Sequence, residues 1–199
     1  MKKIAITQRI IKNSTYYEIR EALDIRWGRL FKELNFLPII LPYKYDFKKY
    51  DFDGVILSGG NDIGEIDLRD KFEYNLIEYC LEQDIPIFGV CRGLQIVAKY
   101  FNSTFKKVDN QIGLKHNLVV NEHSKYAKLL KKINIVNSYH NIAIDRLDDN
   151  LTISAWNEDK TIIKAIEHKK KKIFAVMWHS EREEPFKKEE LQLIMEFFQ

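Results

Sequence analysis

The stretch Ile87-Phe88-Gly89-Val90-Cys91-Arg92-Gly93-Leu94-Gln95 decides the fold of this chain. An apolar strand, opened by Pro86, runs directly into a helix with one apolar face, and a cysteine stands at the junction. Glycines two positions before and two positions after Cys91 indicate a tight turn that lifts its side chain off the end of the strand. A buried strand followed at once by a helix predicts a parallel sheet with Cys91 at its carboxyl edge.

Strands and helices alternate from this stretch back toward the N-terminus. Apolar runs predict strands at residues 3–7, 37–41 and 55–57. Apolar residues three or four positions apart predict a helix from Ile19 to Leu34, in which Gly28 costs about 1 kcal/mol relative to alanine. A second apolar helical face lies within residues 72–83. This alternation is typical of a sheet that is covered by helices on both faces.

The second half of the chain is richer in strands. We expect them at residues 117–120, 133–137, 151–156, 161–167 and 173–177. The basic run Lys169–Lys172 separates the last two and is interpreted as a solvated hairpin turn. A final helix carries Leu191, Ile194 and Phe198 on one side. The sequence thus predicts a single domain over residues 1–199, an α/β fold with a mostly parallel central sheet flanked by helices and extra strand pairings in the second half.

Composition narrows the class of protein. The 32 basic and 29 acidic residues are interleaved, and a net charge of +3 argues against a nucleic-acid-binding protein. Neither a signal peptide nor an apolar run of roughly 18 residues is visible, so no membrane partner is expected. The two cysteines, Cys80 and Cys91, form no disulfide or metal motif. We expect a cytoplasmic protein with reduced thiols and neither a metal nor an organic cofactor.

The pattern around Cys91 indicates a nucleophilic thiol. A helix N-terminus directly after the cysteine favours the thiolate, whereas Cys80, on an apolar helical face, is expected to be a core residue. Thiol chemistry also needs a proton donor for the leaving group. His179 follows an apolar strand, and Glu181 stands two residues later, which places both side chains on the same side of an extended segment. The carboxylate is then able to orient the imidazole as general base.

The other four histidines are weaker candidates. His116, His123 and His168 stand in polar surroundings and are expected at the surface. His140 follows Ser138 and Tyr139 at the end of a strand, so we expect it to line the site without acting as the base.

A Gly-Gly turn completes the predicted site. Ser58-Gly59-Gly60 ends the third strand, where glycines let the main chain approach a ligand closely. An N–H of this turn and the N–H of Arg92, just after the cysteine, are candidate donors for an oxyanion. Ligand sites of open parallel sheets lie beyond the carboxyl ends of the strands, which is where this turn and Cys91 are expected.

Together these motifs resemble the class I glutamine amidotransferase superfamily over the full length of the chain. The resemblance rests on SGG at 58–60, GVCRGLQ at 89–95 and WHSE at 178–181. It implies a flavodoxin-like three-layer sandwich and hydrolysis of a γ-glutamyl amide without a cofactor. The implied roles are Cys91 as nucleophile, His179 as base and acid, and Glu181 as orienting carboxylate. Gly59, Gly60 and Arg92 would form the oxyanion site, and Gln95 and the backbone around Ser138 and Tyr139 would bind the glutamyl group.

Within the superfamily, GGNDI at 59–63, GVCRG at 89–93 and NSYHN at 137–141 resemble the stand-alone γ-glutamyl hydrolases. Two departures are visible. Ser180 replaces the usual proline between His179 and Glu181, which is expected to loosen the turn, and the loop at 63–67 is short. The motif variants are most similar to hydrolases of a nucleotide-linked γ-glutamyl amidate in capsular polysaccharide synthesis. Side chains that could reach a diphosphate, although solvated surface is their default interpretation, are Arg92, Lys106, Lys107, Lys115 and His116.

Three alternatives stay open at this stage. The amine side of the substrate could be another γ-glutamyl amine, such as γ-glutamyl-γ-aminobutyrate. A glutaminase component would pass ammonia to a synthetase, but no obligate synthetase partner is expected, because the chain carries no acceptor domain. A catalytically inactive binding protein should lack one of the catalytic residues, and none is missing.

Overall fold

One eight-stranded sheet runs through the computed structural model, which describes residues 1–109 and 111–199. Its strands follow the order β4-β1-β5-β6-β14-β13-β12-β9. They are β4 (Phe36–Ile40), β1 (Lys2–Ile6), β5 (Gly54–Leu57), β6 (Ile87–Val90), β14 (Ile173–Val176), β13 (Ile163–His168), β12 (Leu151–Trp156) and β9 (Val119–Val120).

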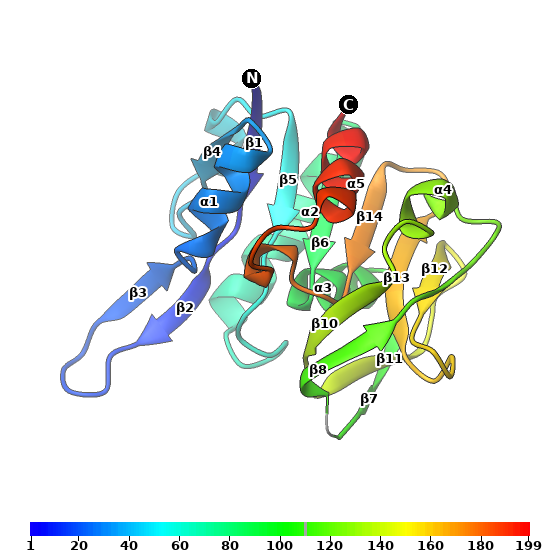
Figure 1. The fold of residues 1–199 in the computed structure, drawn as a ribbon. Helices are drawn as coiled ribbons and strands as arrows, with labels where there is room; N and C mark the ends of the chain where they lie inside the picture. The colour runs from blue at the N-terminus through cyan, green and yellow to red at the C-terminus, as the bar shows by residue number, and fades with distance from the viewer. Residues whose placement is uncertain (110) are drawn as a thin grey trace.

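The N-terminal side of this sheet is parallel and is covered on both faces. Strands β4, β1, β5, β6 and β14 pair in parallel, and every residue of β5, β6 and β14 is buried. Helices α1 (Arg26–Glu33) and α5 (Lys188–Phe198) lie on one face, and α2 (Asp67–Glu82) and α3 (Arg92–Tyr100) lie on the other (Figure 1). Since parallel strands buried on both sides need apolar residues throughout, the continuous apolar runs are explained. The expected three-layer α/β sandwich is confirmed.

The register of the central strands gathers three chain segments at one edge. Strand β6 lies between β5 and β14, with Leu57 opposite Gly89 and Val90 opposite Val176. The residues that follow these strands are the Gly-Gly turn at 58–60, Cys91, and the segment that leads to His179. Their convergence follows from the parallel direction of the strands.

The second half extends the sheet with antiparallel strands. Each of the strands β14, β13, β12 and β9 pairs antiparallel with the next one in this order. Residues 169–172 form the expected turn between β13 and β14. Two small two-stranded sheets pack beside them: β8 (Ile112–Asn117) with β10 (Ile135–Tyr139), and β7 (Thr104–Lys107) with β11 (Ile142–Arg146). The extra pairings are confirmed, but β7, most of β8 and β11 were not predicted. The expected strand at 117–120 is divided at Leu118 between two sheets.

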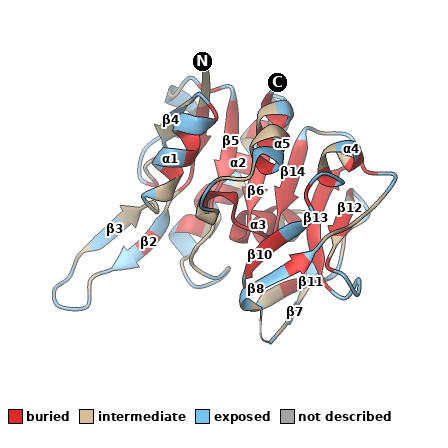
Figure 2. Cartoon of the chain, viewed as in Figure 1, coloured by how far each residue is buried: buried red, intermediate tan, exposed pale blue. Residues whose placement is uncertain are grey.

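The expected helix from Ile19 to Leu34 is wrong at its beginning. Residues 19–22 form β3 (Ile19–Ala22), which pairs with β2 (Arg9–Lys12) in a hairpin that projects from the body, and most of it is exposed (Figures 1 and 2). The helix begins only at Arg26, whose backbone N–H donates to Asp24 Oδ1 at 3.0 Å. Asp24 therefore ends the extended hairpin strand and satisfies one of the free N–H groups of the first helical turn. Residues 19–22 have the apolar spacing of a helix, but their pairing with β2 makes them a strand. Only the later part of the pattern, in α1, is helical.

The remaining elements are short. They are η1 (Phe47–Lys49), α4 (Ala127–Leu130) and η2 (Ser180–Arg182). No helix in the described part of the chain is long and apolar enough to cross a membrane.

Candidate active site

Cys91 stands on a strained turn that close backbone packing enforces. Its φ of 54° and ψ of −103° place a non-glycine residue in a sparsely populated region, immediately before α3. A Cβ on Gly93 would lie 2.0 Å from the carbonyl oxygen of Leu57, and one on Gly89 would lie 2.7 Å from the carbonyl of Gly93. Neither position accepts a side chain, so the glycine frame is a packing requirement of the elbow. The predicted nucleophile elbow is confirmed as a structure.

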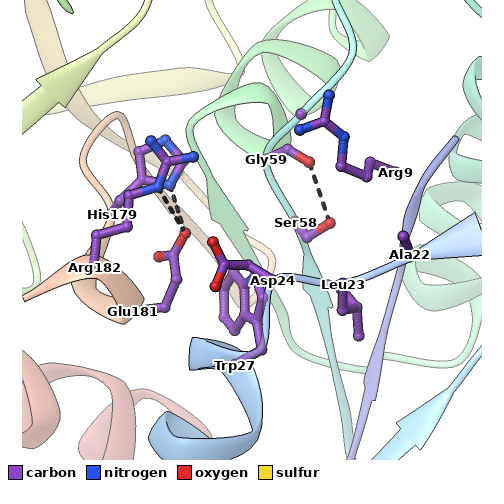
Figure 3. Close-up of a pocket in the computed structure, with 11 residues that line it drawn as sticks. Arg9, Ala22, Leu23, Asp24, Trp27, Ser58, Gly59, His179, Glu181 and Arg182 are labelled. Carbon is purple, nitrogen blue, oxygen red and sulfur yellow. Dashed lines mark hydrogen bonds and ion pairs between the residues drawn. The ribbon is translucent and has the colours of Figure 1, made fainter. Parts of the chain in front are cut away.

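His179 and Glu181 are paired beside this elbow. Nδ1 of His179 lies 2.6 Å from Oε1 of Glu181, and the two residues are 1% and 2% exposed (Figure 3). The carboxylate accepts from Nδ1, which directs Nε2 of the ring away from Glu181. Gly59 leaves room for the ring, because a Cβ at that position would lie 2.8 Å from His179 Cε1 and 3.7 Å from Cys91 Cβ. The Gly-Gly turn, the Cys91 side chain and the His179 ring are therefore close neighbours.

The electrostatics of His179 favour its protonated form. Burial alone would lower its pKa, but the negative charge of Cys91, then that of Glu181, and hydrogen bonds to both raise the pKa to about 9. Opposite charges within a few ångströms stabilise each other in this way. A thiol, a protonated imidazole and a carboxylate arranged in this order can act as a nucleophile with a proton donor beside it.

The backbone of His179 is held by a residue that we did not predict. Asn137, at the middle of β10, accepts from the His179 backbone N–H at 2.9 Å and donates to the His179 carbonyl, also at 2.9 Å. The same amide donates to Glu183 Oε1 at 2.7 Å. Asn137 begins the NSYHN motif, but the motif does not show that its side chain binds the backbone of His179, so only the fold reveals this link.

Ser180 does not loosen the turn. It is buried in η2, and its hydroxyl donates to Oε2 of Glu190, a buried residue of α5. The second carboxylate oxygen of Glu190 lies 3.2 Å from Lys187 Nζ. Burial raises the pKa of the Glu190 carboxyl, whereas the Ser180 hydroxyl and the positive charge of Lys187 act in the opposite direction and stabilise the carboxylate. A hydrogen bond to a neighbouring helix therefore fixes the turn where the family pattern has proline.

A cavity of about 150 Å³ connects most of the predicted residues. The predicted residues that line it are Gly60, Cys91, Arg92, Gln95, Tyr139, His140 and His179. Asp62, Asn141 and Arg182 complete the lining. Gln95 donates through Nε2 to the carbonyl of Ile142 at 3.0 Å, which joins α3 to β11. His140 lines the cavity as expected, and burial, followed by the charge of Lys164, lowers its pKa to about 3.

Two main-chain amides at this cavity have no hydrogen-bond acceptor among the residues that the structure describes. Gly60 has a φ of +97°, and Arg92 is the first residue of α3. In the described part of the chain, the N–H groups of Gly60 and Arg92 donate to no protein acceptor. Free N–H groups near a nucleophile are the donors that a developing oxyanion requires.

Three expectations about side chains are wrong, those for Arg92, His116 and His168. The guanidinium of Arg92 is buried and forms ion pairs with Glu73 and Asp70, so it is not available to a ligand. The expectation for Ser138 concerns its backbone and stays a prediction, since its side chain is fully buried and its hydroxyl accepts from Lys164 Nζ at 3.1 Å. His116 and His168 are buried instead of lying on the surface, with His116 close to Glu158 and His168 packed on Phe101.

Lys164 is the second residue that the sequence did not reveal. It is fully buried in β13, and its Nζ lies 3.1 Å from Ser138 Oγ and 3.1 Å from His140 Nε2. Burial lowers its pKa to about 8, against the raising effect of the charges of Glu158 and Cys91. It supports the end of β10, because its partners are Ser138 in that strand and His140 directly after it. In the sequence it stands within an apolar strand pattern that predicted only core.

No cluster of three or more His, Cys, Asp or Glu side chains suited to a metal ion occurs among the residues that the structure describes.

Comparison with known proteins agrees with this geometry. The chain matches the peptidase C26 family profile over residues 4–181. It is 42% identical to the gamma-glutamyl-CDP-amidate hydrolase of Campylobacter jejuni, over 98% of this chain and 96% of that protein. It is 30% identical to a putative glutamine amidotransferase-like protein of Lactococcus lactis, over 85% and 82% of the two chains.

Solved structures show the same fold. A putative subunit of GMP synthase from Thermoplasma acidophilum superimposes with a TM-score of 0.75 at 23% identity, covering 100% of this chain and 92% of that one. A glutamine amidotransferase from Thermotoga maritima superimposes with a TM-score of 0.66 at 19% identity, covering 98% and 82%. This chain belongs to the peptidase C26 family of the class I glutamine amidotransferase-like superfamily.

Proposed function

We propose that this protein is a thiol hydrolase that cleaves γ-glutamyl-CDP-amidate into glutamate and cytidine diphosphoramidate. The observation that carries the reaction type is the meeting of Cys91 and His179 at one cavity, with Glu181 on the far ring nitrogen of His179. Two main-chain amides at the same cavity have no acceptor among the described residues. The observation that carries the substrate is the 42% identity to a hydrolase of that name over nearly the whole of both chains. A role in the modification of capsular polysaccharide and action without a synthetase partner are parts of the same proposal.

The first half of the reaction transfers the glutamyl group to the enzyme. The Cys91 thiolate attacks the γ-carbonyl carbon, and the carbonyl oxygen becomes an oxyanion that accepts from the N–H groups of Gly60 and Arg92. His179 then gives its proton to the amide nitrogen as the carbon–nitrogen bond breaks. The amidate leaves, and the γ-glutamyl group stays on Cys91 as a thioester.

The second half returns the enzyme to its starting state. His179, now neutral, takes a proton from a water molecule that attacks the thioester carbonyl. The carbon–sulfur bond breaks, glutamate is released, and the thiolate–imidazolium pair is restored. Glu181 holds the ring in the required tautomer through both halves. We assign Gln95 and the main chain at Tyr139 to the α-amino and α-carboxylate groups of the glutamyl substrate, with Ser138 as support through Lys164.

A parallel assay tests this function. The purified protein alone is offered γ-glutamyl-CDP-amidate, γ-glutamyl-γ-aminobutyrate and glutamine, and glutamate release is measured for each. We expect kcat/KM to be highest for the CDP-amidate. A preference for γ-glutamyl-γ-aminobutyrate would reassign the leaving group, and a preference for glutamine would indicate the glutaminase component of an amidotransferase.

A further inference from the structure

A second, smaller cavity lies on the other side of His179. It has a volume of about 50 Å³ and shares Gly60, His179 and Arg182 with the cavity that contains Cys91. Figure 3 shows His179 and Arg182 on one side of it and Arg9 on the other, with Asp24 and Trp27 at its edge. Since one water needs about 10–15 Å³ of such space, the cavity takes a group of a few heavy atoms and not a nucleoside.

Arg182 lines both cavities. Its guanidinium lies over the Tyr139 ring at 4.6 Å from the centroid, and its Nε is 3.8 Å from Glu181 Oε1. That Nε is buried and has no hydrogen-bond partner among the described residues. A stacked guanidinium with a fixed plane and unused N–H groups is well suited to bind a phosphoryl group.

Arg9 reaches the same cavity from the projecting hairpin. Asn61 fixes the base of this hairpin to the Gly-Gly turn, because its side chain accepts from the Ile10 N–H at 2.8 Å and donates to the Ile10 carbonyl at 3.0 Å. Arg9 packs against Gly60, where an added Cβ would lie 2.9 Å from Arg9 Cβ. In the described part of the chain, Arg9 forms no ion pair with a carboxylate.

The charges around this cavity favour an anion. Its two carboxylates already have partners: Asp24 is bound by Arg26 at 2.6 Å, and Glu181 is bound by His179 at 2.6 Å. Arg9 and Arg182 therefore contribute positive charge that no nearby carboxylate fully compensates.

We propose that Arg9 and Arg182 bind the phosphoryl group of the leaving amidate, directly beside the nitrogen that His179 protonates. This inference rests on the proposed function, because in a nucleoside diphosphoramidate the scissile nitrogen is bonded to phosphorus. A phosphoryl group one bond from that nitrogen must lie next to His179, where the small cavity has room for it. The site selects phosphorylated amines over simple amines and leaves the nucleoside outside the cavity.

Another cavity offers the competing location. It has a volume of about 640 Å³, shares Asp62 and Asn141 with the cavity of Cys91, and contains Lys107. It also contains Asp109, so its two carboxylates outnumber its one lysine. It has space for a nucleoside, but its charge is less suited to the phosphoryl group.

The test compares two substrates in matched variants. Arg9→Met, Arg182→Lys, Lys107→Met and Lys12→Met are assayed with γ-glutamyl-CDP-amidate and with γ-glutamyl-p-nitroanilide, whose leaving group has no phosphoryl group. Lys12 is the control, because it is an exposed basic residue of the same hairpin strand and lines neither cavity near His179. For Arg9→Met and Arg182→Lys, we expect the ratio of kcat/KM for the CDP-amidate to that for the anilide to fall about 10- to 100-fold, the size of one charge-assisted hydrogen bond.

The outcomes separate this inference from the function itself. An unchanged ratio in Arg9→Met, or a larger fall in Lys107→Met, would overturn the assignment of the phosphoryl group to this cavity. If the wild-type protein cleaves only other γ-glutamyl amides, the proposed function fails. In that case, inhibition of anilide hydrolysis by pyrophosphate, weakened by Arg9→Met and unaffected by Lys12→Met, would still support an anion site here. Absence of such inhibition would reject the site as well.

Discussion

The two halves of the catalytic pair are positioned by different forces. Cys91 is held by main-chain packing, because the backbone at Gly89 and Gly93 packs too closely for a side chain, against the carbonyl of Leu57 in the case of Gly93. His179 is held by side chains, with Asn137 on its backbone and Glu181 on its ring. Ser180 adds a hydrogen bond from the same turn to α5.

This difference predicts how each half responds to change. Replacing a glycine beside Cys91 forces backbone movement, which damages the fold. Replacing a hydrogen-bonding side chain around His179 leaves the fold in place and misaligns the ring, which damages the rate. Substitutions of the glycines at the elbow should therefore mainly lower the stability of the fold, whereas substitutions around His179 should mainly lower the catalytic rate.

The largest effect is expected at the nucleophile itself. Cys91→Ala should lower kcat for γ-glutamyl hydrolysis by at least about 10⁵-fold, because no other group can form the thioester. Cys80→Ala is the control, since that thiol is buried in the core, where burial raises its pKa to about 12. Glutamate release and circular dichroism check both variants, and residual turnover in Cys91→Ala would exclude the thioester route.

The next effect concerns Glu181. Glu181→Gln should lower kcat on the order of 10³- to 10⁴-fold, because the amide can present the wrong partner to Nδ1 and so favour the wrong tautomer. Circular dichroism should show an unchanged fold.

The pH dependence of the same variant gives an independent measure. His179 must keep its proton to release the amine, and its pKa is raised to about 9, so kcat/KM of the wild type should fall as pH rises through about 9. Glu181→Gln removes a charge that raises this pKa, so the alkaline limb should move to lower pH. A limb that stays in place would mean that Glu181 does not interact with the titrating group.

A pair of glycine substitutions sharpens the contrast between stability and rate. Gly93→Ala should lower the free energy of unfolding by about 3 kcal/mol or more, because the new Cβ would lie 2.0 Å from the Leu57 carbonyl oxygen. Gly28→Ala meets nothing within 4 Å in α1 and should raise it by about 0.5–1 kcal/mol. Urea unfolding measures both, and equal effects would show that packing at the elbow is loose.

The smallest effect on the rate is expected at Asn137. Asn137→Ala removes two hydrogen bonds from the backbone of His179 and should lower kcat about tenfold with little change in KM. Ser180→Ala is the comparison, because it removes a buried hydrogen bond from the same turn without touching the backbone of His179. We expect a smaller loss of kcat there, and an equal loss would mean that Asn137 acts only through general stability.

The same difference explains which parts of the molecule could be predicted. The elbow at Cys91 depends on five consecutive residues, 89–93, that can be read directly from the sequence. The parallel strands around it are continuous apolar runs. Both were therefore predictable. His179 and Glu181 also lie close together in sequence, which made their pairing predictable.

Contacts between distant segments left no such local signal. Asn137 and Lys164 act across strands that the sequence does not place together, so their roles could not be predicted. Strand β3 was mistaken for the beginning of a helix, because Ile19 and Leu23 happen to share a helical spacing with α1. Arg92 was assigned to solvent, although Glu73 and Asp70 on α2 bind it in the interior. Each error concerns a partner that only the fold supplies.

Trapping the covalent intermediate tests the chemistry at its decisive step. Wild-type protein is mixed with γ-glutamyl-CDP-amidate, quenched in acid within milliseconds, digested and examined by mass spectrometry. We predict a γ-glutamyl adduct on the peptide that contains Cys91, formed together with a burst of cytidine diphosphoramidate that precedes glutamate release. Rapid turnover with no adduct on Cys91, or an adduct on Cys80 instead, would contradict it.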